Sequence, residues 1–209
     1  MTVVGLLLAA GAGRRMGRPK ALVVDDDGAW LPRATRVLLD GGCSRVVVVL
    51  GAGAVEARAL LASADEAIGD AEPVEVVVAP DWEQGQSASL RAGLAALLAG
   101  SSASATPDAG ARTDTPSAAL VHLVDLPDVG PDVVRRLVAE ARPDLLRRAV
   151  YAGVPGHPVL LGRAHWRSIA AAVEGDRGAR DYLDEHAGEL ERVECGDLAG
   201  GGDVDHMRP

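Results

Sequence analysis

The stretch with the clearest chemical potential lies near the N-terminus, where an apolar run leads into a loop of glycine and arginine. This loop contains Gly11, Gly13, Gly17, Arg14, Arg15 and Arg18, and it ends at Pro19-Lys20. Glycines let backbone N–H groups approach phosphate oxygens, and basic side chains neutralise their charge. Lys20 is the only lysine of the chain, which favours a specific role for its compact ammonium. The loop therefore predicts a polyphosphate site.

Two common phosphate-binding loops do not match this stretch. Walker A requires GxxxxGK[ST], which the segment from Gly13 to Lys20 does not supply. A dinucleotide fingerprint requires GxGxxG, but Met16 stands at the third glycine position, and the strand ending at Leu50 is not followed by a ribose-binding acid. The charge of the loop favours a triphosphate over NAD.

A triphosphate site needs a metal ion, and the chain offers a candidate ligand for it in Asp125. Asp125 directly follows the apolar run 119–124, so a hard carboxylate is expected at the end of a buried strand. An Asp before Leu-Pro is also a good turn starter, and both interpretations remain open. The three aspartates at 25–27, followed by Gly28, are read mainly as a solvated turn, with a metal site as the alternative.

The elements that must position these residues alternate between strands and helices. The pattern predicts strands in the N-terminal apolar run and at 45–50, 74–79, 119–124, 149–151 and 159–161. It predicts helices after Pro32 and at 55–64, 87–99, 131–141 and 165–173, and a last helix that ends near 186. We predict that Ser87 caps its helix. The alternation predicts an α/β fold, a three-layer α/β/α sandwich with a Rossmann-like, mostly parallel sheet. Ligands then bind at the carboxyl ends of the strands.

Length and composition narrow the class of protein. The 209 residues fit a single domain, 1–209, with a mobile low-complexity insertion expected at 100–117. A net charge of −9 and an aromatic content of 2% argue against a nucleic-acid partner. Two cysteines without CxxC spacing, no signal-peptide pattern and no membrane-length apolar run predict a cytoplasmic protein without a membrane partner.

Several blocks resemble the MobA-like nucleotidyltransferases, and within them the molybdenum cofactor cytidylyltransferases. They are LLLAAGAGRRMGRPKAL at 6–22, GQSASLRAGL at 85–94, GHPVLLGR at 156–163 and GDRGARDYL at 175–183. The alanine pair in LAAG, in place of LAGG, is similar to the CTP-using branch. The resemblance implies Mg²⁺-dependent transfer of a nucleoside monophosphate, CMP from CTP or another NTP, to a phosphorylated molybdopterin-type acceptor with release of pyrophosphate. It also implies a molybdoenzyme or its chaperone as a partner.

The same resemblance assigns roles to individual residues. Arg15, Lys20 and Asp125 would be catalytic. The nucleotide would contact Leu8, Ala9, Ala10, Gly11, Ala12, Gly13, Arg14, Gln86, Ser87 and Ser89. His157, Asp176 and Arg180 would face the acceptor, although His157 between Gly and Pro fits a structural turn equally well. Asp125 would bind Mg²⁺, with Asp205 as a second ligand in a C-terminal segment that departs from the family pattern D-[IV]-D-T-P-E-D.

Two other functions compete with nucleotidyl transfer. Proteins resembling this family are also described as NAD(P)H-dependent oxidoreductases, the nicotine blue oxidoreductases, and the loop arginines would then serve a 2′-phosphate. A non-catalytic nucleotide-binding or cofactor-chaperone module is a third reading, favoured by the altered C-terminal segment. The presence of both Lys20 and Asp125 speaks against it.

Overall fold

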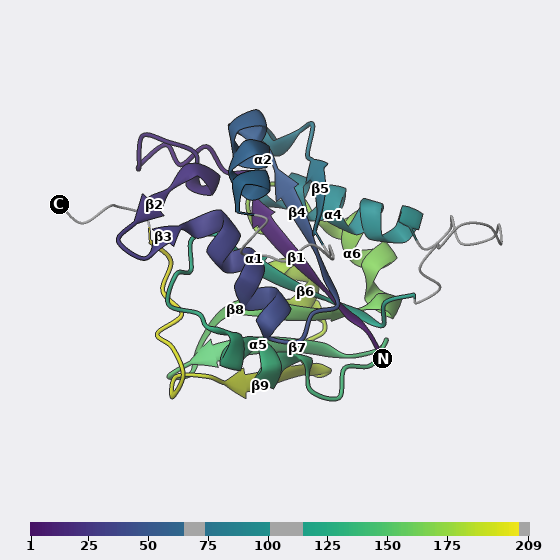
Figure 1. Cartoon of the computed structure of the whole chain (residues 1–209). Helices are drawn as coiled ribbons and strands as arrows, with labels where there is room; N and C mark the ends of the chain where they lie inside the picture. Colours follow the sequence, from purple (N-terminus) through teal and green to yellow (C-terminus); the bar gives the residue numbers. More distant parts are fainter. Residues whose placement is uncertain (65–73, 101–114, 205–209) are drawn as a thin grey trace, which may run out of the picture.

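The computed structural model describes residues 1–64, 74–100 and 115–204, and its centre is a seven-stranded sheet (Figure 1). The strands of this sheet are β1 (Val3–Ala9), β4 (Arg45–Leu50), β5 (Val74–Val78), β6 (Ala118–Leu123), β7 (Leu146–Tyr151), β8 (Val154–Gly162) and β9 (Leu190–Glu194). The helices are α1 (Trp30–Asp40), α2 (Ala54–Ser63), α4 (Gln86–Gly100), α5 (Pro131–Val138), α6 (Trp166–Ala172) and α7 (Arg180–Glu185), with 3-10 turns η1 (Lys20–Leu22), η2 (Trp82–Gln84) and η4 (Arg163–His165). A small hairpin joins β2 (Val24–Asp25) to β3 (Gly28–Ala29).

The sheet order is β5-β4-β1-β6-β8-β7-β9, and most neighbouring strands are parallel. The strand β1 lies between β4 and β6, with Leu7 opposite Val48 and His122. Among the strands that the structure describes, only β8 runs against its neighbours, β6 and β7. The carboxyl ends of β1, β4 and β6 therefore meet at one edge, as the sequence predicts for a Rossmann-like sheet.

Helices cover both faces, which confirms the three-layer sandwich. One core forms between the sheet and α1, α2 and α5, and the other between the sheet and α4, α6 and α7. Both are almost wholly aliphatic, as expected for a chain without Phe. Helix α4 approaches closely because Gly93 has no side chain: a Cβ there would lie 2.5 Å from Leu6. The close approach places the middle of α4 against the middle of β1.

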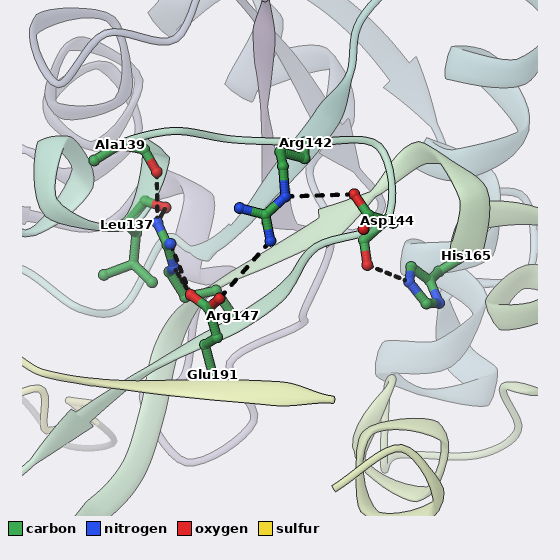
Figure 2. Close-up of polar contacts among 7 residues, drawn as sticks. All are labelled: Leu137, Ala139, Arg142, Asp144, Arg147, His165 and Glu191. Atoms are coloured by element: carbon green, nitrogen blue, oxygen red, sulfur yellow. Dashed lines mark hydrogen bonds and ion pairs between the residues drawn. The ribbon is translucent and has the colours of Figure 1, made fainter. Parts of the chain in front are cut away.

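Arg147 holds the far edge of the sheet together (Figure 2). Its guanidinium donates to Glu191 on β9 at 2.7 and 2.9 Å, and to the carbonyls of Leu137 and Ala139 at the end of α5. A cation at the C-terminus of a helix satisfies carbonyls that have no partner within the helix. These contacts connect α5, β7 and β9. Because successive side chains of a strand point to opposite faces of the sheet, the next residue, Arg148, lies on the other face of β7.

Several sequence expectations need correction. Strand β9 was not predicted, and β7 and β8 are longer than expected, so Gly156 to Pro158 lie inside a strand and not in a turn between two strands. Ser87 is not a helix cap: α4 begins at Gln86, and the Ser87 hydroxyl donates to the carbonyl of Glu174 at 2.8 Å. The expected insertion at 100–117 lies mostly outside the described residues, at 101–114. No helix in the described ranges is long and apolar enough to cross a membrane.

The acidic turn at 25–27 has a structural role. Asp25 accepts hydrogen bonds from both terminal nitrogens of Arg33 at 2.9 and 2.8 Å, and from the indole of Trp30 at 2.6 Å. The bidentate contact with Arg33 and the Trp30 bond outweigh burial and lower the pKa of Asp25 to about 2. Asp25 thereby attaches the hairpin to α1.

We expect Asp25→Asn to destabilise the fold in a pH-dependent way. A carboxyl whose pKa is lower in the folded state stabilises the protein above its unfolded pKa, and this contribution is lost as the pH falls toward 2. Because the pair is partly solvent-screened, the loss at neutral pH should be about 1–2 kcal/mol in unfolding free energy. Urea unfolding between pH 7 and pH 3 measures it, with Asp26→Asn as the exposed control. An equal deficit at both pH values would contradict the ion-pair explanation.

Candidate active site

The glycine-arginine loop closes on itself at the end of β1. The amide of Met16 donates to the carbonyl of Gly13 at 2.8 Å, and the amide of Lys20 donates to that of Gly11 at 3.3 Å. Gly13 has φ +57°, and a Cβ on it would lie 2.0 Å from the carbonyl oxygen of Arg18. Only glycine fits this position. Ala9 and Ala10 are buried, whereas Gly11, Ala12 and Gly13 are at least partly exposed, so the backbone after β1 reaches the surface.

Lys20 and Asp125 meet across this edge. The Lys20 ammonium forms an ion pair with the Asp125 carboxylate, although 105 residues separate them in the chain. Their side chains are 19% and 11% exposed. Two opposite charges at such depth interact more strongly than a surface pair. The structure thus brings together two of the three residues assigned to catalysis; the third, Arg15, lies exposed on the same loop and has contacts of its own.

The C-terminal segment runs beside the loop that carries Asp125. The amide of Val204 donates to the carbonyl of Asp125 at 3.0 Å, and the amides of Gly200 and Gly201 donate to the Asp128 carboxylate at 2.8 and 2.9 Å. Figure 1 shows this segment, in yellow, returning from β9 toward β2 and β3. Asp205, predicted as a second metal ligand, follows directly in the chain but lies outside the described residues.

The start of α4 is bound to the segment before α7. The Ser87 amide donates to the carbonyl of Gly175 at 3.0 Å, and a Cβ on Gly85 would lie 2.0 Å from Oδ1 of Asp176. Ser87 and Ser89, both predicted to contact nucleotide, are buried. The blocks at 85–94 and 175–183 therefore form one unit, while Asp176 faces Gly85.

A cavity of about 50 Å³ lies next to this unit. Its apolar walls come from β1, β6, β8, α4 and α7, and its polar residues are Gln86, Arg148, His157, Arg177 and Arg180. The structure thus groups His157 and Arg180, predicted to face the acceptor, with Gln86, predicted to contact nucleotide. Burial, together with the nearby His122 and the cavity arginines, lowers the pKa of His157 to about 3. His157 is therefore a neutral imidazole at pH 7.

Sequence reasoning missed two residues beside these sites. Trp82 in η2 packs against the end of β4, where a Cβ on Gly51 would lie 2.5 Å from its ring. Its partial exposure beside Ala10 contrasts with the burial of Trp30 and Trp166, so its fluorescence is suited to report ligand binding at the loop. Arg148 was missed because its strand was predicted to begin at 149; an arginine directly before an apolar strand is the signal that could have found it.

Most of the chain matches the sequence model of a known family. The family model for the MobA-like NTP transferase domain matches residues 5–190, which include the glycine-arginine loop, Asp125 and the cavity. The chain belongs to the MobA-like NTP transferase family. The proteins similar to this chain are named as enzymes of different kinds, among them an oxidoreductase and a nucleotidyl transferase.

Three similar proteins illustrate this range. Nicotine blue oxidoreductase of Paenarthrobacter nicotinovorans is 36% identical over 213 residues, which cover 97% of this chain and 92% of that protein. The structure of Rv0371c from Mycobacterium tuberculosis in complex with manganese is 25% identical, with a TM-score of 0.62, covering 93% of this chain and 88% of that one. A nucleotidyl transferase from Methanothermobacter shares the fold at 20% identity, with a TM-score of 0.73 and coverage of 98% and 92%.

A divalent cation fits the site of this family member. Asp125 offers a hard carboxylate just after the end of β6, where it is paired with the Lys20 ammonium. No group of three or more His, Cys, Asp or Glu among the described residues could hold a metal. Mg²⁺ commonly takes one or two carboxylates and completes its shell with substrate phosphates and water. The donor set suits a metal that is bound together with a triphosphate.

Proposed function

We propose that the chain is a Mg²⁺-dependent nucleotidyltransferase that moves CMP from CTP to a phosphorylated pterin-type acceptor. The observation that carries the proposal is the meeting of Lys20 and Asp125 at the carboxyl edge of β1 and β6, beside a closed glycine loop. A dinucleotide reductase has no evident use for this pair, whereas a triphosphate substrate needs both a cation and a metal ligand.

The proposed reaction needs little general acid–base catalysis from the protein. The acceptor phosphate is ionised at neutral pH and attacks the α-phosphorus of CTP, the bond to the β-phosphate bridging oxygen breaks, and pyrophosphate leaves. The backbone N–H groups from Ala9 to Gly13 would hold phosphate oxygens, and Lys20 and Arg15 would stabilise the charge that develops on pyrophosphate. Asp125 would hold the Mg²⁺, which supplies charge neutralisation on the phosphates.

The acceptor side of the proposal rests on the cavity beside α4. Its polar residues are contributed by α4, β7, β8, the segment before α7 and the first residue of α7, and Leu8 near the end of β1 also lines it. An acceptor bound there would lie beside the end of β1, from which the glycine-arginine loop starts. A molybdoenzyme or its chaperone would receive the product.

A second function is favoured by one comparison. The 36% identity to a nicotine blue oxidoreductase across nearly the whole chain supports an NAD(P)H-dependent reductase. Thermal unfolding separates the two proposals, because a ligand that binds the folded state raises its stability. We expect CTP to stabilise the protein only with Mg²⁺, and more than GTP does. Stabilisation by NADPH that is indifferent to Mg²⁺, without a response to CTP, would overturn the transferase proposal.

The loop geometry gives a prediction for nucleotide binding. Gly13→Ala introduces a methyl group against the Arg18 carbonyl at a positive φ, so the loop cannot close as it does here. We expect the affinity for Mg·CTP, followed by Trp82 fluorescence, to fall by roughly ten-fold or more, since a positive φ alone costs about 1–2 kcal/mol.

Gly17→Ala is the matched control for this loop. Gly17 also has a positive φ, +70°, but a Cβ there meets nothing within 4 Å. It should bind Mg·CTP more tightly than Gly13→Ala. Equal losses in the two variants would mean that backbone strain, and not the contact with Arg18, determines the effect.

A further inference from the structure

The cavity beside α4 has an unbalanced charge. Among the described residues no carboxylate lines it, although three arginines do. Arg177 is neutralised by Asp181, with hydrogen bonds of 2.7 and 2.9 Å. Neither Arg148 nor Arg180 forms an ion pair with any acid in the described part of the chain. Two unneutralised guanidinium groups therefore face one small space.

Arg148 is the more informative of the two because it is half-buried on the sheet. Its Nε donates to the carbonyl of Gly156 at 3.1 Å, which holds the guanidinium beside His157. Burial and the neighbouring Arg180 lower the pKa of Arg148 from its usual value, and Asp184 opposes this effect from α7. Arg180 is exposed, so the cost of holding two like charges together falls mainly on the half-buried Arg148, and a bound anion would offset that cost.

The other polar groups of the cavity fit an anion as well. His157 is a neutral imidazole at pH 7, so it can donate one hydrogen bond without adding a third charge. The Gln86 side chain lies against Gly178, where a Cβ would be 3.3 Å from Oε1. A space of about 50 Å³ holds a single oxyanion group, since one water needs roughly 10–15 Å³. The rest of a ligand would extend out of the cavity.

We propose that Arg148 and Arg180 form an oxyanion subsite in this cavity, which takes the phosphate or carboxylate group of the second substrate and selects anionic acceptors over neutral ones. The proposal rests on the proposed function in placing the second substrate here. The guanidinium of Arg148, fixed by the Gly156 carbonyl, is the specificity-determining group, because a planar fork matches an oxyanion in two contacts.

Phenyl phosphate and benzoate are suitable probes for this subsite, and benzyl alcohol is the neutral control. We expect isothermal titration of the full chain, without nucleotide or metal, to detect phenyl phosphate or benzoate but not benzyl alcohol. The stronger of the two anions identifies the group that the subsite prefers. Arg148→Met should weaken that binding by about ten-fold or more, and Arg148→Lys by less.

Arg192→Met is the matched control variant. Arg192 lies opposite Arg148 in the pairing of β7 with β9, but it does not line the cavity. Arg192 acts on Arg148 only through its charge, so this variant should weaken anion binding much less than Arg148→Met does. The response of each variant to Mg·CTP reports folding and the nucleotide site separately, so a failure of the transferase proposal appears there and not in the titration.

Three results would overturn the subsite. The first is wild-type protein that binds neither anion, and the second is Arg148→Met that binds as tightly as the wild type. The third is competition between saturating Mg·CTP and the bound anion, which would assign the arginines to the nucleotide and not to a second substrate.

Discussion

Asp125→Asn is expected to lower kcat/KM for CMP transfer by roughly 10²–10³-fold while the protein remains folded. The amide keeps the size of the side chain but removes the negative charge, so it neither holds a divalent cation well nor balances Lys20. The substitution sits at the end of β6, outside both aliphatic cores. Its main effect should therefore fall on metal-dependent chemistry.

Asp128→Asn provides the control for Asp125→Asn. It makes the same chemical change three residues along the same loop, where the carboxylate holds the amides of Gly200 and Gly201. Turnover measured over a range of Mg²⁺ concentrations, together with Mn²⁺ binding by electron paramagnetic resonance in the presence of CTP, separates the two residues. If Asp128→Asn were as inactive as Asp125→Asn, the loop and not the carboxylate of Asp125 would be essential.

The sequence predicted the fold well where hydrophobic patterns are long. The valine run of β4 and the leucine run of β1 are buried on both faces, and such strands read as continuous apolar stretches. Strand β9 was missed because Leu190–Glu194 is a short, mostly charged segment without apolar alternation, and its side-chain contact comes from Arg147 on β7, 44 residues away in the chain. Local sequence carries no signal for such a pairing.

The sequence predicted the parts of the candidate site that follow apolar strands, but not the parts that depend on long-range contacts. The glycine loop and Asp125 were found because each follows an apolar strand, and the ends of parallel strands converge. Local pattern could not show that Ser87 would bond to Glu174 and not cap its own helix, since that contact spans 87 residues. Nor could it show that Arg148 would face a cavity while Arg147 faces Glu191, because the assignment depends on the register of β7.

Lys20→Met is expected to change metal binding and nucleotide binding in opposite directions. Methionine keeps most of the aliphatic stem but removes the ammonium, so the triphosphate loses a charge-assisted contact. The affinity for Mg·CTP should fall by about ten- to 100-fold. In the absence of nucleotide, Mn²⁺ should bind more tightly than in the wild type, because Lys20 no longer competes for the Asp125 carboxylate.

Lys20→Arg tests whether charge alone explains both effects. It retains a cation that can pair with Asp125, so Mn²⁺ alone should bind about as weakly as in the wild type, whereas Mg·CTP should bind less well than with lysine because the planar fork does not reproduce a compact ammonium. A purely structural role for Lys20 predicts weaker binding of both ligands in Lys20→Met. The opposite signs are therefore the decisive result: if Mn²⁺ alone bound more weakly to Lys20→Met, Lys20 would support Asp125 and not compete with the metal for it.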